Sequence, residues 1–181
     1  MDIQSTVLRQ ASQEEMTIIQ FIAGKVYGPT YLKILGQQQV NYMLGKLYST
    51  SALWELMDQG HIFLIAQIQQ QDVGFVTFNC TNAGKGIFKL QKLYVLPEMQ
   101  GSGMGAFLVK EVIARVQQLE GKLLQLNVNR FNRARGFYEK LGFRVTEEVD
   151  IPIGEGYYMN DYVMEMVLEG ERPFSDKLIV I

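Results

Sequence analysis

Three glycines at alternate positions, Gly101, Gly103 and Gly105, lie between a short apolar run and a run of helical spacing. The apolar run Leu93–Leu96 predicts a strand, and it ends at Pro97, which cannot donate a hydrogen bond within a sheet. A glycine-rich loop at the start of a helix leaves backbone N–H groups free, and the helix dipole there favours an anion. Because glycine has no Cβ, a phosphate can approach this backbone closely. The stretch therefore predicts a phosphate-binding loop.

The spacing of the glycines excludes two common phosphate loops. A dinucleotide fingerprint needs Gly-x-Gly-x-x-Gly and an acidic residue at the end of a second strand about twenty positions on, and neither is present. A Walker loop would place Lys and Ser or Thr after the last glycine, whereas Ala106 and Phe107 follow here. A tight turn that binds no ligand requires similar glycines, so this alternative stays open for the loop alone.

Two motifs together resemble a known superfamily. The pattern Gln100-x-x-Gly103-x-Gly105 after a strand resembles the pyrophosphate loop of the Gcn5-related N-acetyltransferase (GNAT) superfamily, whose members bind acetyl-coenzyme A. Residues 132–143 contain Phe-Tyr-x-Lys-x-Gly-Phe, which resembles the second signature of the same superfamily. The two signatures stand in the superfamily's order, and the resemblance extends over residues 8–168.

Length and composition fit one globular domain. The chain has 181 residues, of which 48% are hydrophobic and 20% charged. A net charge of −2 without a basic block gives no electrostatic case for nucleic acid. The apolar runs are too short for a membrane span, and the N-terminus does not resemble a signal peptide. With one cysteine and one histidine, we expect neither a disulfide nor a metal site in a cytoplasmic protein.

Apolar periodicity and turn residues predict the order of elements. The expected strands are 7–11, 61–66, 73–78, 87–96, 123–128, 144–148 and 159–168, and the expected helices are 13–26, 32–60, the segment from the glycine loop to Gly121, and 131–140. Breaks are expected at 27–31 and 151–156. The resemblance implies the α/β GNAT fold, with a mixed, mainly antiparallel sheet of about seven strands, splayed between strands 4 and 5 and flanked by about four helices. We expect one N-acetyltransferase domain over residues 1–168 and a C-terminal tail over 169–181.

Acetyl transfer requires a positioned thioester carbonyl, a neutral amine and a proton for the leaving thiolate. The resemblance implies that the backbone of strand 4 holds the pantetheine arm, that the glycine loop binds the pyrophosphate, and that Asn132 reaches the cofactor arm. It also implies that Tyr138, a phenol, lies near the sulfur as the acid, with a core tyrosine as the alternative. The implied cofactor-binding residues are Leu93, Tyr94, Val95, Gln100, Gly101, Ser102, Gly103, Met104, Gly105, Ala106, Asn132 and Tyr138, with acetyl-CoA as cosubstrate and no metal.

The residue that acts as base is not identified by the motifs. Many superfamily members carry a glutamate on strand 4, but Lys89, Gln91 and Lys92 occupy the candidate positions here. Asp161 and Glu155, near the last strand, are the remaining side-chain candidates, with a surface carboxylate as the alternative for each. Bulk water, or a substrate amine in its free-base form, is the alternative to any side-chain base.

Several other side chains have open roles. Cys80 would suit a covalent acyl-enzyme, but no histidine is near it in sequence, and inert packing is the preferred reading. His61 is expected to be a packing or cap residue rather than a base. Arg130, Arg133 and Arg135 either meet the 3′-phosphate of coenzyme A or form a solvated face. The early aromatics, Tyr27, Tyr31, Tyr42, Tyr48 and Trp54, either line a substrate cleft or, as we favour, pack mostly in the core.

The resemblance implies transfer of an acetyl group from acetyl-CoA to a primary amine by direct attack in a ternary complex. Residues 27–31, 42–44 and 48–49 resemble the branch that includes bacterial polyamine acetyltransferases, which implies a small amine such as a polyamine. A protein or peptide N-acetyltransferase and a non-catalytic acetyl-CoA sensor are the alternatives. The intact Gln100, Gly103, Gly105 and Tyr138 favour catalysis, while the absent strand-4 glutamate keeps the sensor open. The expected state is a monomer or a homodimer.

Overall fold

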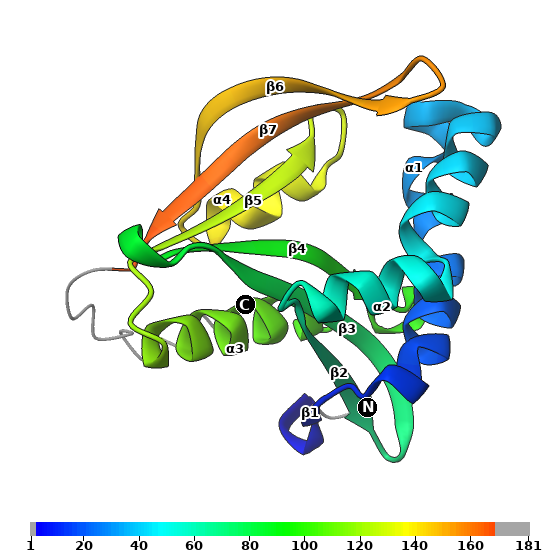
Figure 1. The fold of residues 1–181 in the computed structure, drawn as a ribbon. Coiled ribbons are helices and arrows are strands. Elements are labelled where there is room, and N and C mark those ends of the chain that lie inside the picture. The colour runs from blue at the N-terminus through cyan, green and yellow to red at the C-terminus, as the bar shows by residue number, and fades with distance from the viewer. Residues whose placement is uncertain (1–2, 169–181) are drawn as a thin grey trace.

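The computed structural model describes residues 3–168, in which helices cover both faces of one seven-stranded sheet (Figure 1). The strands, in the spatial order β1-β2-β3-β4-β5-β7-β6, are β1 Val7–Gln10, β2 Ile62–Ile68, β3 Gln71–Asn82, β4 Ile87–Val95, β5 Leu123–Asn129, β6 Arg144–Gly154 and β7 Tyr157–Val167. The helices are α1 Met16–Tyr48, α2 Thr50–Asp58, α3 Met104–Gln118 and α4 Ala134–Lys140. The predicted mixed α/β architecture is confirmed, and the predicted tail, 169–181, lies outside the described residues.

Strands β4 and β5 form the single parallel pair of the described sheet, and they separate after a short pairing. Pairing joins Ile87–Leu90 to Leu123–Leu126, whereas β4 continues to pair with β3 as far as Val95. A bulge at Gln91 shifts the β3–β4 register between Leu90 and the next residue. Because a bulge bends its strand and increases the twist, it turns β4 away from β5. The predicted splay is therefore confirmed.

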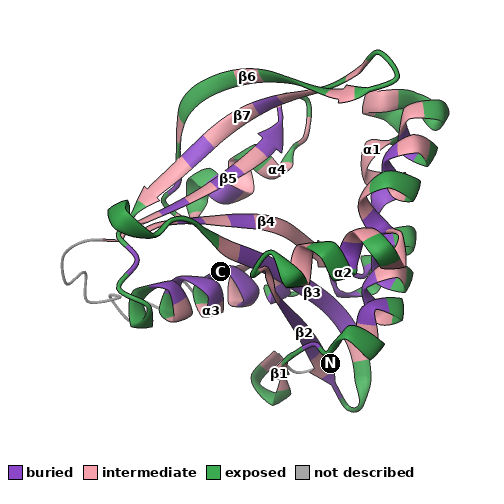
Figure 2. Cartoon of the chain, in the orientation of Figure 1, coloured by how far each residue is buried: buried purple, intermediate pink, exposed green. Residues whose placement is uncertain are grey.

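The core is divided between the two faces of the sheet (Figure 2). Strand β2 has both faces buried, with Phe63 and Ile65 facing one way and Leu64 and Ala66 the other, as its period of two requires. One face packs against α3 and the other against α1 and α2. The outer strand β6 is largely exposed.

Helix α1 runs through the break predicted at residues 27–31. Pro29 lies inside the helix, and the next residue, Thr30, donates its hydroxyl to the Val26 carbonyl at 2.7 Å. Burial of Val26 and Tyr27 against the sheet outweighs the hydrogen bond that proline removes. The interruption comes instead at Gly36, whose φ of 75° lies in the region that glycine tolerates.

The second correction concerns the predicted loop at 151–156, which is mostly strand. The tip of the β6–β7 hairpin, residues 151–158, reaches the second half of α1 (Figure 1). Gln39 donates to the Tyr158 carbonyl at 2.9 Å, and the Tyr42 hydroxyl donates to the Ile153 carbonyl at 2.7 Å. We call this tip the hairpin roof. None of the helices formed by residues 3–168 combines the length and apolar character that a membrane crossing requires.

Candidate functional site

Two cavities meet at β4. The splay cleft, of about 560 Å³, lies between the separated edge of β4, the glycine loop and α4. The tyrosine cavity, of about 470 Å³, lies on the α1–α2 side, under the hairpin roof. Residues that line both are Tyr31, Leu90, Gln91, Lys92, Tyr94 and Asn127. The junction of the cavities is therefore the part of β4 that follows its pairing with β5.

Most of the residues implied by the motifs line the splay cleft. These are Leu93, Tyr94, Val95, Gln100, Gly101, Gly103, Gly105, Ala106, Asn132 and Tyr138. Ser102 and Met104 do not line it. The Ser102 hydroxyl donates to the Met99 carbonyl at 2.6 Å, and the Met104 side chain is buried in the core. Their N–H groups are also engaged within the loop, that of Ser102 by the Met99 carbonyl and that of Met104 by the Ser102 hydroxyl, each at 3.4 Å.

The glycine loop presents free backbone donors at the start of α3. Gly101 and Gly103 have φ values of 78° and 92°, which are unfavourable for other residues. Among residues 3–168, no acceptor bonds the N–H groups of Gly101, Gly103 or Gly105. The Gln100 side chain donates to the Val95 carbonyl at 3.0 Å and so ties the loop to the end of β4. The loop can thus bind an anion by its backbone.

Tyr138 and Asn132 lie on the α4 side of the splay cleft. The Tyr138 ring packs edge-on against Phe137 and Phe143, with centroids 5.0 and 5.8 Å away. Its hydroxyl has no protein partner within residues 3–168, and burial raises its pKa, so the phenol keeps its proton. The Asn132 side-chain oxygen accepts the N–H of Ala134, the first residue of α4, at 2.9 Å, while its amide nitrogen lies 3.4 Å from the Tyr31 hydroxyl.

Tyrosines form the wall of the tyrosine cavity. Tyr27 and Tyr48 are buried, and the Tyr48 hydroxyl donates to that of Tyr94 at 2.9 Å. The Tyr27 and Tyr31 rings lie with centroids 4.5 Å apart. Burial raises the pKa of all four phenols, so they remain neutral hydrogen-bonding groups. Of the five early aromatics, Tyr27, Tyr31 and Tyr48 both pack and line this cavity, whereas Tyr42 and Trp54 do not line it and Trp54 is exposed.

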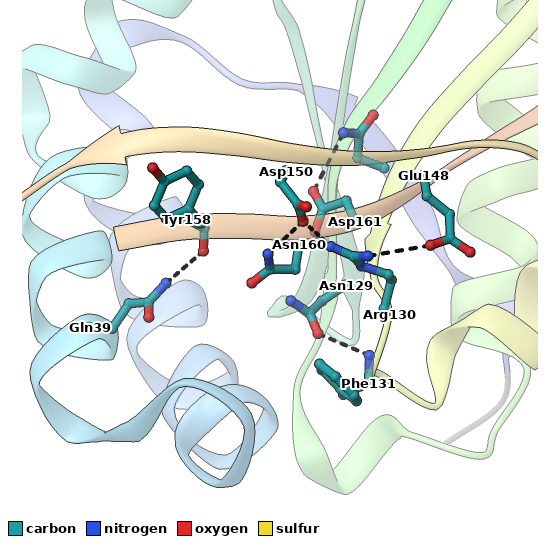
Figure 3. Close-up of polar contacts among 10 residues, drawn as sticks. Gln39, Asn129, Arg130, Phe131, Glu148, Asp150, Tyr158, Asn160 and Asp161 are labelled. Atoms are coloured by element: carbon teal, nitrogen blue, oxygen red, sulfur yellow. Dashed lines mark hydrogen bonds and ion pairs between the residues drawn. The ribbon is translucent and has the colours of Figure 1, made fainter. Parts of the chain in front are cut away.

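Asp161 is the buried carboxylate of the tyrosine cavity. Its side chain is 3% exposed, and burial raises its pKa, while Asn127 and the charges of Lys89 and Arg130 partly lower it. The Asn127 amide nitrogen lies 3.4 Å from an Asp161 oxygen (Figure 3 shows Asp161). The other candidate base, Glu155, sits in the exposed turn of the hairpin roof and lines neither cavity.

Asn127 and Asn129 were not singled out from the sequence, although they line the tyrosine cavity. They alternate along β5 with the buried Leu126 and Val128. This alternation is the signal that could have found them, because every second residue of a strand shares one face. The Asn127 side-chain oxygen is buried without a hydrogen-bond partner, so it is free to accept a proton donor from a ligand.

A second set of polar groups lies on β4 and at the start of β2. Burial lowers the pKa of Lys92 to about 8. Burial also lowers the pKa of Lys89, an effect that the charge of Asp161 partly offsets. His61 lines the tyrosine cavity, and its pKa is lowered by burial and then by the Lys92 charge. It is therefore neutral near pH 7 and faces a cavity, where a packing or cap role was expected.

The three arginines line neither cavity. Arg130 forms ion pairs with Glu148, at 3.3 Å, and with Asp150 (Figure 3). Arg135 pairs with Glu139 at 2.8 Å within α4. Of the two readings for this cluster, these pairs favour a solvated structural face.

Cys80 is exposed on β3 and lines neither cavity, so the expected burial of this thiol is wrong. Within the part of the chain that the structure describes, no three His, Cys, Asp or Glu side chains gather as they would around a metal ion.

Comparison with known proteins assigns most of the chain to one family. Residues 31–159 match the acetyltransferase (GNAT) domain family. An uncharacterized N-acetyltransferase from Mycobacterium bovis is 38% identical over 77 residues, which are 42% of this chain and 49% of that protein. One from Archaeoglobus fulgidus is 34% identical over 101 residues, or 52% of this chain and 67% of that protein. The chain thus matches about half the length of the mycobacterial relative.

Solved structures share the fold over nearly the whole chain. The PaiA N-acetyltransferase from Thermoplasma acidophilum, in complex with coenzyme A, has a TM-score of 0.76 and 23% identity, covering 90% of this chain and 99% of that one. A spermidine N-acetyltransferase from Vibrio cholerae, in complex with CoA and spermine, has a TM-score of 0.68, 17% identity and coverage of 91% and 96%. A ribosomal-protein-alanine N-acetyltransferase from Brucella melitensis has a TM-score of 0.67, 17% identity and coverage of 89% and 99%. The fold implied by the motifs is confirmed.

Proposed function

Because the chain belongs to the GNAT family of acetyltransferases, we propose that it transfers the acetyl group of acetyl-CoA to a primary amine in a ternary complex. The observation that carries this proposal is the meeting of two cavities at the separated edge of β4. One cavity offers backbone donors for a cofactor, and the other offers a buried carboxylate for an amine. A reaction between two bound substrates needs this juxtaposition.

The splay cleft fits coenzyme A in its chemistry. The free N–H groups of Gly101, Gly103 and Gly105, at the N-terminus of α3, suit a pyrophosphate. The edge of β4 beyond Gln91 does not pair with β5, so its backbone is available to the amides of a pantetheine arm. When bound there, acetyl-CoA supplies the activated acetyl thioester.

The residues at the junction can position and deprotonate the amine. The unpaired Asn127 side-chain oxygen lines both cavities and can accept an N–H of the attacking amine. We assign Asp161, which lies one hydrogen bond away, as the base that accepts the amine proton. On the other side of β4, the Tyr138 hydroxyl has no protein partner within the described residues and can donate to the leaving sulfur. Its raised pKa keeps that proton in place until the thiolate forms.

We propose a small amine as the acceptor, and a polyamine is the class that the branch resemblance favours. The hairpin roof, bonded to α1, covers the tyrosine cavity and restricts the access of a folded protein substrate. The solved neighbours act on both kinds of acceptor by their names, a spermidine and a ribosomal-protein alanine, so they support acetyl transfer without selecting one. The cytoplasmic location and the monomeric or dimeric state stay predictions.

Release of free thiol from acetyl-CoA with a panel of amines tests this function. The panel contains spermidine, simple alkylamines, amino acids and short peptides that begin with alanine, each compared with a reaction that lacks amine. We expect at least one small amine to be acetylated faster than every peptide. Turnover of peptides alone would overturn the choice of acceptor. Tight acetyl-CoA binding without turnover of any amine would favour a sensor over an enzyme.

A further inference from the structure

Lys92 carries a charge that the protein does not pair. The residue is half-buried on β4 at the junction of the two cavities, and its ammonium lies 5.1 Å from the centroid of the Tyr48 ring. Among residues 3–168, no carboxylate forms an ion pair with it and no side chain hydrogen-bonds it. An unpaired cation in a partly desolvated cavity is costly unless an anion joins it.

His61 has an unsatisfied group in the same cavity. It is the single histidine of the chain, and its Nδ1 atom is buried without a hydrogen-bond partner. His61 and Lys92 interact electrostatically, because the positive charge of Lys92 lowers the pKa of His61. Lys92, an unpaired cation, and His61, which has an unpaired ring nitrogen, therefore line the same cavity. Neither takes part in the chemistry proposed above.

The remaining charges of the tyrosine cavity do not suit a polycation. Among the described residues, three lysines line it, Lys46, Lys89 and Lys92, together with two carboxylates, Glu55 and Asp161. Glu55 is exposed, so one buried carboxylate is left to attract a ligand with several positive charges. A polyamine would meet three lysines there, and like charges at short range repel.

We propose that the acceptor is an amine that also carries an anionic group, such as a carboxylate, held between Lys92 and His61. This inference rests on the proposed function and selects a different acceptor from the polyamine of the branch resemblance. The amine would lie at Asp161 and Asn127, and its acidic group at the opposite wall formed by β4 and the start of β2. The ligand anion satisfies both groups that the protein leaves unpaired.

Matched amines test the proposal by kinetics. We compare γ-aminobutyrate and β-alanine with butylamine and putrescine as acceptors. The better aminocarboxylate should exceed both carboxylate-free amines in kcat/KM by about tenfold or more, since a charged hydrogen bond is lost without the anion. Lys92→Gln should remove this advantage mainly by raising KM, and Lys92→Arg should retain part of it. Lys85→Gln, which changes an exposed lysine outside both cavities, is the matched control and should leave all four acceptors unchanged.

The single histidine gives a second readout that needs no turnover. The NMR titration of His61 should shift to higher pH when γ-aminobutyrate binds, because an anion beside an imidazole favours its charged form. Butylamine, which has no anionic group, should leave the titration midpoint of His61 unchanged. A preference for putrescine, or an unmoved His61 titration with γ-aminobutyrate bound, would overturn the inference. A moved titration without acetylation of any amine would instead support the anion site and reject the proposed function. These spectra use the unmodified protein, so the result does not depend on the folding of a variant.

Discussion

Replacing Asp161 by asparagine should lower the rate of acetyl transfer without destabilising the protein. The side chain is 3% exposed, and burial raises its pKa above the ordinary value of 3.8. The folded chain therefore holds this proton more tightly than the unfolded chain does. As pH rises from the unfolded to the folded pKa, the free energy of unfolding falls, and it stays lower at neutral pH. Asparagine has no charge to desolvate, so the variant escapes this cost.

The magnitude follows from the same contacts. Each unit by which the folded pKa is raised corresponds to about 1.36 kcal/mol, and each kcal/mol moves Tm by about 2–4 °C in a chain of this size. The substitution also removes the negative charge that attracts Lys89 and Arg130, and this loss offsets part of the gain in stability. The contact with Asn127, at 3.4 Å, is long and therefore weak, and an asparagine oxygen can still accept it.

Two assays check the prediction. With the best amine of the panel, kcat should fall by about 10²–10⁴-fold, as expected for a lost general base. Thermal unfolding should give the variant an equal or higher Tm at about pH 8, and this difference should shrink as the pH is lowered through the raised pKa of Asp161, because the wild-type carboxylate then binds a proton. A variant that is less stable by more than about 1 kcal/mol would show that the carboxylate is a structural ion partner. Activity within about threefold of wild type would show that another group is the base.

Four further predictions concern the other parts of the site. Gly103→Val should lower acetyl-CoA affinity at least about tenfold by calorimetry, because φ is 92° and a branched side chain enters the loop; unchanged affinity with an intact fold contradicts the phosphate assignment. Tyr138→Phe should keep Tm and acetyl-CoA affinity but lower kcat about 10- to 1000-fold, and equal losses of binding and turnover would mean a structural role. Gly154→Ala should raise the KM of the acceptor, because the new Cβ would lie 2.6 Å from a tyrosine hydroxyl of α1. Gly156→Ala is the matched control, since this glycine also has a positive φ, of 75°, but no atom lies within 4 Å of the new Cβ. Equal KM values in the two variants would reject the hairpin roof as a wall of the acceptor cavity. KM for a carboxylate-bearing amine should rise above pH about 8 as Lys92 loses its proton, and a flat profile would exclude Lys92 as the anion partner.

Local signals in the sequence were sufficient for the sheet and the glycine loop. The short apolar runs of β2 and β3, the alternation along β5 and the glycines at fixed positions each depend on a few neighbouring residues. The two motifs also predicted the splay of β4, because a superfamily signature carries the geometry of its strand with it. These features did not require knowledge of distant contacts.

Features decided by distant contacts were missed or misplaced. Pro29 indicated a break, but packing of the surrounding helix on the sheet carries α1 through it to Gly36. Strand β6 lies at the exposed edge, so it lacks a clear apolar alternation, and its second half was predicted as a loop. The tyrosine cavity combines Lys92 of β4, Asn127 of β5 and Asp161 of β7, and no local pattern indicates that these three meet.

The hairpin roof also bears on the order in which the molecule forms. Gln39 and Tyr158 are 119 residues apart, so their hydrogen bond closes a long loop, which slows its formation relative to local contacts. At ribosomal rates of about 5–20 residues per second, α1 waits roughly 6–24 s for the strand that completes its cavity. The hairpin roof over the tyrosine cavity therefore closes in a nascent chain only after β4, the glycine loop and α4 have been synthesised.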